Sequence, residues 1–579
     1  MKTCVKMISD LRIKSLISLM ALYSLSMIMI NGSFMVSYYN IAHLVLLGLL
    51  IIPLYTIFIY REKKIHLIAL TTLAISMTLL IPLRGILVSG DFNTEFTSGK
   101  ITVLYGTFMP DFSPPHSAVA VNSLLNPILS IITGVDILQV FRFSAIIPIF
   151  LLSISSYMFY RIILKEEDAF ISTIFLITQF YIIEGCVWPA RHMYSLALLL
   201  LLAYEFVKDR KTVIILSIAI ATYYYAMGYL ATIFIFLLTF ILTIIYKYKL
   251  NVNIGGRGII IHGVTVAIII FSTTFLWYSQ EGSILSLTGH IKIIIRFLSE
   301  FFRGVEPEQL GITERRLVQS TFIGDYLTYG SMFLLTIVSG LGTLYMLVEL
   351  IKSRKVESDN NKISAYTFIL TSWIVFVVFF VPLMAGSLGV PRIYEVFFTF
   401  SVAMIPIGLG KTVQVLRTAL KYVHKYLYLA ITCMLLLLSI MANAKIFYFI
   451  LNEEPLSIMF TKNSTQDMIW RVSRTEIEAG LFLMKYRQES YPIYGDEYSL
   501  RRPSLFWNGS SAVAYRSLFL TLPSKGSYEG YVFLDRYNLY SGELLVFGKA
   551  WTFTPLRLNL FNGNKVYSNN HTEVYFVGG

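Results

Sequence analysis

Long apolar runs separated by short polar segments make up most of this chain. A run of about 17 to 25 apolar residues is long enough to cross a bilayer as a helix. Such runs lie near residues 15–34, 41–60, 65–88, 138–160, 168–184, 191–207, 228–246, 258–278, 328–351, 363–383, 393–411 and 426–449. A shorter run at 212–227 is also needed if the charged segments are to alternate between the two sides. The pattern predicts a polytopic α-helical membrane protein with about thirteen transmembrane helices.

The charges between the runs indicate how the chain is oriented. Clusters of lysine and arginine, such as those at 61–64, 208–211 and 352–355, all fall on the same side of the predicted membrane. Short loops rich in these residues stay in the cytoplasm. We therefore expect a multi-pass protein of the cell membrane with a cytoplasmic N-terminus. With an odd number of spans, the C-terminus is extracytoplasmic.

The last part of the chain differs from the rest in composition and in its hydrophobic pattern. After residue 450 it is polar and carries Asn-Gly turn signals at 508 and 562, with alternating segments such as 573–577. These features favour a small α/β domain. We predict a transmembrane domain over 1–450, with outer loops at 89–137 and 279–327, and an extracytoplasmic domain over 451–579. In the first loop, the apolar piece 119–132 is too short to cross and return, so we expect a helix lying in the membrane interface.

Composition agrees with this class. Of 579 residues, 56% are hydrophobic and 14% are charged, and the mean hydropathy is +0.67. The net charge of +13 comes largely from loop lysines and arginines, so it indicates topology and not a nucleic-acid partner. Cys4, Cys186 and Cys433 lie too far apart in the sequence for metal-ligand spacing, and three cysteines form no disulfide framework.

The segment Gly90-Asp91-Phe92-Asn93-Thr94-Glu95 follows the third apolar run, where a helix should emerge into water. Asp91 and Glu95 are four residues apart, so one helical turn would put both carboxylates on the same face. Two acids at the mouth of a membrane helix are suited to general-base catalysis or to holding a divalent cation such as Mg²⁺ or Mn²⁺. The alternative is that both are solvated residues closing a span.

Other polar residues fall near the same outer boundary. Arg191 and Arg392 each open an apolar run, where a guanidinium group can bind a phosphate through two hydrogen bonds. Arg142 is a further candidate for phosphate binding. Simple interfacial anchoring is the alternative for each arginine. Candidates for substrate binding on that side are His116, His192, Tyr225 and Glu395.

The order of these elements resembles the GT-C class of membrane glycosyltransferases, which includes protein mannosyltransferases and oligosaccharyltransferases. Short motifs resemble those of archaeal multi-spanning proteins of that type, namely the acidic segment 90–95, Asn122-Ser-Leu-Leu, Val140-Phe-Arg with Pro148, Arg191-His-Met, Pro391-Arg-Ile-Tyr and the segment 564–569. Those relatives often have a His-Tyr pair where this chain has Tyr224-Tyr225, so the chain departs from the pattern there.

The resemblance implies transfer of a sugar from a polyprenyl-phosphate (dolichyl-phosphate) carrier to a glycan, lipid or protein acceptor on the outer face. It implies that Asp91 is the catalytic base or a metal ligand, with Glu95 in support. Arg392, Arg191 and Arg142 would neutralise the leaving lipid phosphate. Inversion at the anomeric carbon is usual in this class.

Three other hypotheses about the function stay open. A polysaccharide polymerase or ligase also uses arginines and a histidine in outer loops but lacks the early acidic pair. A transporter or lipid flippase would need broken or charged helices near the bilayer midplane and usually an inverted repeat. The break at 223–228 is the one segment that hints at it. An inactive relative serving as a scaffold is the third.

Overall fold

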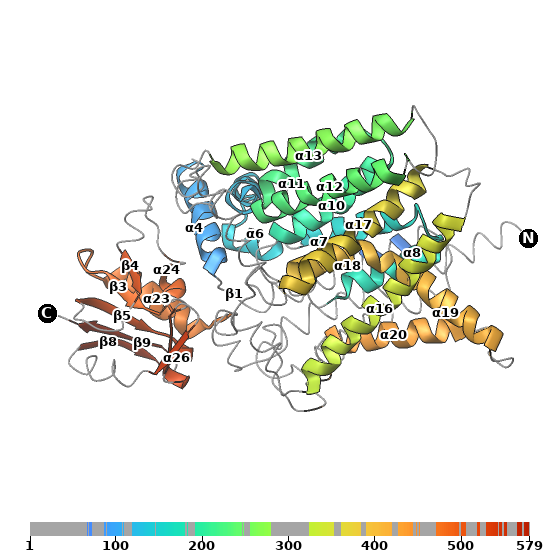
Figure 1. The fold of residues 1–579 in the computed structure, drawn as a ribbon. Helices are drawn as coiled ribbons and strands as arrows, with labels where there is room; N and C mark the ends of the chain where they lie inside the picture. Colours follow the sequence, from blue (N-terminus) through green and yellow to red (C-terminus); the bar gives the residue numbers. More distant parts are fainter. Residues whose placement is uncertain are drawn as a thin grey trace, which may run out of the picture.

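A computed structural model shows a mostly helical protein with a β-sheet near the C-terminal end of the chain (Figure 1). The structure describes residues 66–67, 69–71, 86–87, 90–106, 108, 119–144, 146–179, 182, 191–245, 247, 255–279, 323–352, 360–383, 390–419, 427–443, 447, 451, 471–496, 499–504, 506, 518–521, 529–541, 543–546, 549–552, 564–569 and 572–577. The predicted runs at 15–34 and 41–60 lie outside these residues, as do most of the run at 65–88 and of the loop at 279–327.

The apolar runs within the described part of the chain form helices. They are α6 (Ile137–Phe143), α7 (Ile146–Tyr160), α8 (Glu166–Ile177), α10 (Arg191–Val207), α11 (Thr212–Tyr223), α12 (Tyr225–Ile245), α13 (Gly255–Ser279), α16 (Ile323–Lys352), α17 (Asn360–Leu383), α18 (Val390–Ser401), α19 (Ile405–Ala419) and α20 (Leu427–Asn443). A short 3₁₀ segment, Val402–Met404, joins α18 to α19. Apolar runs of this length become helices because each backbone N–H and C=O then has a partner inside its own segment.

Six helical stretches among the described residues are long and apolar enough to cross a membrane: Ile137–Tyr160, Met227–Ile245, Ile260–Tyr278, Tyr326–Ile351, Asn360–Val378 and Tyr394–Leu416. Three shorter apolar helices, Val121–Thr133, Thr212–Tyr223 and Leu427–Asn443, accompany them. These helices support the prediction that the chain is a membrane protein. The expected total of about thirteen spans stays a prediction, since part of the chain lies outside the described residues.

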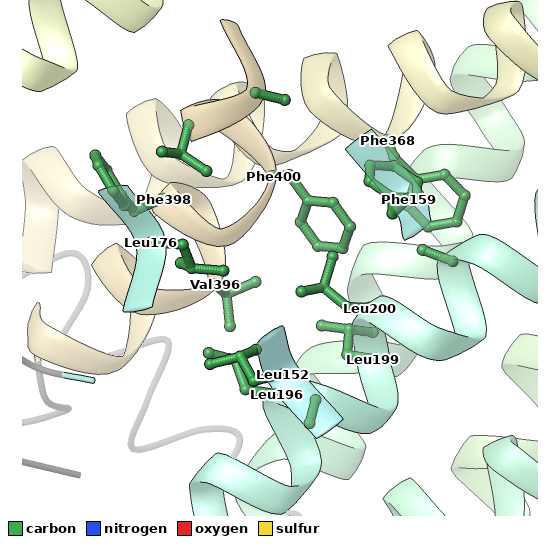
Figure 2. Packing of buried hydrophobic residues seen from close by; sticks show 14 of the residues in the cluster. Leu152, Phe159, Leu176, Leu196, Leu199, Leu200, Phe368, Val396, Phe398 and Phe400 are labelled. Atoms are coloured by element: carbon green, nitrogen blue, oxygen red, sulfur yellow. The ribbon is translucent and has the colours of Figure 1, made fainter. Parts of the chain in front are cut away.

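Buried aromatic and aliphatic side chains pack together in the helical part (Figure 2). Phe400 of α18 stacks on Phe368 of α17, with ring centroids 5.6 Å apart. It also meets Phe159 of α7 edge-on, with centroids again 5.6 Å apart. Leu152, Leu196, Leu199 and Val396 belong to the same buried cluster. This packing fixes α7, α10, α17 and α18 against one another.

The outward sides of several helices carry large apolar residues. Phe240 of α12, Ile261 of α13 and Phe333 of α16 are each more than 60% exposed. Apolar surface on this scale is what lipid-facing helices present, because lipid tails are as apolar as the side chains. The helical part therefore has the surface of a membrane-embedded bundle.

The predicted outer loop at 89–137 is largely helical where it is described. It contains α4 (Gly90–Tyr105), the π-helix η4 (Val121–Leu125), α5 (Asn126–Thr133) and the start of α6. The helix expected over the apolar piece 119–132 is therefore present as η4 and α5. Buried Asn122, Ser123 and Asn126 mark one side of it, while Ile131 and Ile132 are exposed. Its location in the membrane interface stays a prediction.

The last hundred residues hold a mixed sheet of five strands in the order β4-β3-β5-β9-β8. The strands are β3 (Ile493–Gly495), β4 (Phe519–Thr521), β5 (Gly530–Leu534), β8 (Asn564–Asn569) and β9 (Thr572–Val577). The central strand β5 is buried throughout. It runs parallel to β3 and antiparallel to β9.

Around the sheet lie α23 (Arg474–Tyr486), α24 (Arg501–Ser504), α26 (Arg536–Ser541) and a separate hairpin of β6 (Glu543–Val546) and β7 (Lys549–Thr552). A small antiparallel pair joins β1 (Ile86–Leu87) to β2 (Arg471–Val472). Figure 1 shows the five-stranded sheet at the same end of the helical bundle as α4. That the domain is extracytoplasmic, and that it begins at 451, stay predictions.

Candidate active site

Helix α4 carries the acidic pair that the sequence singles out. The helix begins at Gly90, so Asp91 lies in its first turn and Glu95 lies one turn later. Residues at this spacing occupy the same side of a helix. The side chain of Asp91 lies outside the described residues, whereas that of Glu95 is described and completely buried.

Both carboxylate oxygens of Glu95 have a partner. The guanidinium of Arg191 forms an ion pair with Oε1, and the side-chain amide of Asn122 donates to Oε2. Asn122 in turn accepts a hydrogen bond from Asn126, with an N–O distance of 3.0 Å. A buried carboxylate is costly unless it is paired and hydrogen-bonded in this way. The three contacts join α4, η4, α5 and α10 at one point.

Arg191 is the first residue of α10 and is only 5% exposed. A cation at the start of a helix is disfavoured by the helix dipole, so the carboxylate of Glu95 offsets an unfavourable position. The guanidinium carbon also lies 4.8 Å from the centre of the Tyr224 ring, a separation at which a cation–π contact is favourable. Arg191 is thus held on two sides.

Tyr224 interrupts the helical chain between α11 and α12. Its backbone is extended, with φ −160° and ψ 114°, and its ring is buried. Beside it, the ring of Tyr223 meets that of Tyr194 edge-on, with centroids 5.8 Å apart. Tyr224 therefore packs against Arg191, and Tyr223 packs against Tyr194 of α10.

Helices α4 and η4 approach each other closely beside Glu95. A Cβ on Gly99 would lie 2.9 Å from the backbone oxygen of Asn122 and 3.1 Å from the Phe141 ring. The hydroxyl of Thr102 donates to the backbone oxygen of Ser123 at 3.2 Å. Single π-turns of this kind widen a helix and are frequent at functional sites. Here the π-turn contains Asn122, whose amide reaches Glu95.

The other predicted site residues have these places. His192 follows Arg191 on α10, Arg142 is on α6, and Tyr225 opens α12. Arg392 lies in the first turn of α18, and Glu395 is buried three residues later on the same helix. His116 lies outside the described residues, as do the side chains of Arg142, Tyr225 and Arg392. The structure brings Glu95 and Arg191 together; the roles of the remaining residues stay predictions.

Two residues of the cluster, Asn122 and Tyr224, were not predicted as site residues from the sequence. Asn122 belongs to one of the motifs that carry the resemblance, but a single asparagine in an apolar piece gives no sign of its partner. Tyr224 stands in a run of three tyrosines, and the sequence singles out Tyr225 instead. The signal available for Tyr224 was the helix break after Tyr223.

A divalent cation does not fit at Glu95. Both of its oxygens face donors, and one of those donors is the positively charged Arg191, which would repel a metal ion. Among the described side chains, no group of three or more His, Cys, Asp or Glu could hold a metal. Metal binding at Asp91 stays a prediction, because its side chain is not among those described.

Comparison with known proteins gives a family and a set of similar folds. A family model with the description "Predicted membrane protein (DUF2206)" matches residues 211–575; α4 lies outside that range. The comparison with curated proteins gave no match.

Similar solved structures include two GT-C glycosyltransferases, the class indicated by the resemblance of the sequence motifs. One is the oligosaccharyltransferase AglB from Archaeoglobus fulgidus, in complex with an inhibitory peptide and a dolichol-phosphate. It is 12% identical with a TM-score of 0.48, and the match covers 89% of this chain and 74% of AglB. The other is ArnT from Cupriavidus metallidurans bound to undecaprenyl phosphate. It is 11% identical with a TM-score of 0.47, covering 88% of this chain and 97% of ArnT.

Proposed function

This chain belongs to the DUF2206 family of predicted membrane proteins, and we propose that it is a membrane glycosyltransferase. In this proposal it moves a sugar from a polyprenyl-phosphate carrier to a glycan, lipid or protein acceptor on the outer face of the membrane. Asp91 is the catalytic base. Arg392 and Arg142 stabilise the phosphate that leaves with the lipid.

The observation that carries the proposal is the buried cluster of Glu95, Arg191 and Asn122. Ionisable groups within a membrane protein's interior are expensive and are usually retained for function. Here they hold the first two turns of α4 in one position against η4 and α10. Asp91 lies one turn before Glu95 on that fixed helix. The first turn of a helix is a favourable place for a carboxylate because of the helix dipole.

In the proposed step, a hydroxyl or amide group of the acceptor attacks the anomeric carbon of the donor sugar. Its proton passes to the Asp91 carboxylate as the new bond forms. The bond between the anomeric carbon and the phosphate oxygen breaks, and the polyprenyl phosphate leaves with the electron pair. Negative charge on the phosphate grows during this step, so guanidinium groups that bind it lower the barrier.

The proposal gives Arg191 a different task from the phosphate contact that the sequence suggests. Its guanidinium already pairs with Glu95 and lies against Tyr224. We therefore assign Glu95 and Arg191 to the positioning of α4, and leave phosphate binding to Arg392 and Arg142. His116, His192, Tyr225 and Glu395 are the candidates for contacts with the sugar or the acceptor.

The proposal is tested by mass spectrometry of lipid-linked and protein-linked glycans from cells with and without this gene. A sugar missing from one glycan class in the deletion strain, and restored by the intact gene but not by a gene encoding Asp91→Asn, is the expected result. Unchanged glycans together with altered uptake or export of a solute would contradict it and would favour a transporter.

A further inference from the structure

Helix α4 has a second face, which packs against the C-terminal domain. Ile101 is only 2% exposed and lies in a buried cluster whose other members include Leu483, Ile493 and Phe533 of that domain. Phe96 shares another buried cluster with Val472. The helix that carries Asp91 therefore contributes to a core made mainly by residues several hundred positions later in the chain.

The segment just before α4 is also joined to that domain. Strand β1 pairs with β2 in antiparallel fashion, Ile86 opposite Val472 and Leu87 opposite Arg471. Two residues separate β1 from Gly90, the start of α4. The backbone on one side of Asp91 and the buried face of α4 on the other are thus both attached to the C-terminal domain.

Strand β2 is itself anchored to the sheet by polar groups. Ser473 follows β2 and caps α23, and its backbone N–H donates to Oε2 of Glu476 at 2.6 Å. The other oxygen of Glu476 lies 3.0 Å from Nε of Arg502, and Arg502 in turn lies 2.7 Å from Asp535. Asp535 directly follows the central strand β5. All three side chains are buried, so β2 is linked to the sheet through buried ion pairs.

We propose that the C-terminal domain positions Asp91 together with the Glu95–Arg191 pair, with Ile101 and Val472 as positioning residues at the seam between the domain and α4. This inference rests on the proposed function, in which Asp91 is the base. A domain that moved independently of the bundle would need a mobile connection to it. The seam described here is instead apolar and strand-paired, as in a single rigid core.

The direct test is hydrogen exchange of the full-length protein in lipid nanodiscs, comparing Ile101→Ala, Val472→Ala and the wild type. We expect both variants to raise amide exchange over residues 90–99, while exchange over α23 stays within twofold of the wild type. Leu104→Ala is the matched control, because Leu104 is on the same helix and 53% exposed; it should leave exchange over 90–99 unchanged. Ile101→Val serves as a milder variant if Ile101→Ala does not accumulate in membranes, and it should raise exchange by a smaller factor.

The second readout is transfer from a polyprenyl-phosphate hexose. Misplacing a catalytic group by about 1 Å can cost around 100-fold in rate, so Ile101→Ala should lower kcat at least tenfold with the donor KM within twofold. Unchanged exchange over 90–99 in both seam variants would overturn the inference whatever the activity. Raised exchange in a protein whose wild type transfers no sugar would support the positioning of α4 and reject the proposed function. Raised exchange with an unchanged kcat would overturn the role of the seam in placing Asp91.

Discussion

Glu95 and Arg191 form a buried ion pair across 96 positions of sequence. The pair joins the helix that carries Asp91 to the start of α10, and Asn122 and Tyr224 complete its surroundings. In the proposed enzyme, this contact turns a polar segment after an apolar run into a catalytic element with a fixed position.

The pair should show strong coupling in a double-mutant cycle. Glu95→Gln leaves the Arg191 cation buried without its counter-charge, and Arg191→Met leaves the Glu95 anion in the same state. Each change should destabilise the protein by about 3–5 kcal/mol. The double variant should recover most of that loss, since neither charge remains. Thermal unfolding in detergent measures all four proteins; simple additivity of the two losses would contradict the pairing.

Asn122 should matter through the hydrogen bond that it gives to Glu95. Asn122→Leu leaves one carboxylate oxygen of Glu95 buried without that donor, which costs about 1–3 kcal/mol. We expect a lower midpoint of thermal unfolding and a lower rate of sugar transfer. Asn564→Ala is the matched control, because Asn564 is exposed on β8, and it should change neither value. Equal effects of the two substitutions would rule out the assigned role of Asn122.

Gly99 should be intolerant of a methyl group. A Cβ there would lie 2.9 Å from the backbone oxygen of Asn122, so Gly99→Ala must push α4 away from η4 and weaken the contact of Glu95 with Asn122. Overpacking of this kind typically costs about 1–3 kcal/mol. The same substitution at Gly258 of α13 would meet no atom within 4 Å and should be neutral or slightly stabilising. Unfolding curves of the two variants, measured side by side, decide the matter.

The stability of the C-terminal domain should fall as the pH rises. Burial raises the pKa of the Asp535 carboxyl to about 7; the Arg502 guanidinium opposes this shift, and the Asp496 and Glu476 carboxylates add to it. An unfolded aspartate has a pKa of about 3.9, so the folded domain binds more protons between about pH 4 and 7. The stabilisation is therefore fully present below about pH 4 and is lost as the pH rises through 7.

Hydrogen exchange of strand β5 measures this dependence. Protection should be greater at pH 5 than at pH 8 after correction for the intrinsic exchange rate. Asp535→Asn has no carboxyl group to titrate, so protection of β5 in this variant should change little between pH 5 and pH 8. Protection of β5 that increases from pH 5 to pH 8 in the wild type would contradict a raised pKa for Asp535.

Much of the helical part could be predicted from the sequence, because the physics is local. The apolar run at 191–207 is α10, and the run at 258–278 lies within α13. An apolar segment of this length has few alternatives to a helix. The spacing of Asp91 and Glu95 is compatible with a helical turn that places both on one side, and the structure has that turn in α4.

The contacts that define the candidate site depend on the tertiary fold and could not be predicted in this way. Arg191 has the sequence features of a phosphate ligand, and nothing near it in the chain indicates that Glu95 is its partner. Ile101 stands in a short apolar stretch of a predicted outer loop, yet it completes the core of a domain that begins hundreds of residues later. Such pairings are set by which elements meet in space, and one sequence carries no signal for them.

The most direct measurement is sugar transfer by the purified protein in liposomes, using a panel of polyprenyl-phosphate hexoses and following release of polyprenyl phosphate. The wild type should release polyprenyl phosphate from at least one donor in the presence of membrane extract as the acceptor source. Asp91→Asn should slow release by about two orders of magnitude or more, while Glu478→Gln, at an exposed carboxylate of α23, should match the wild type. Full-rate release by Asp91→Asn would contradict the central claim.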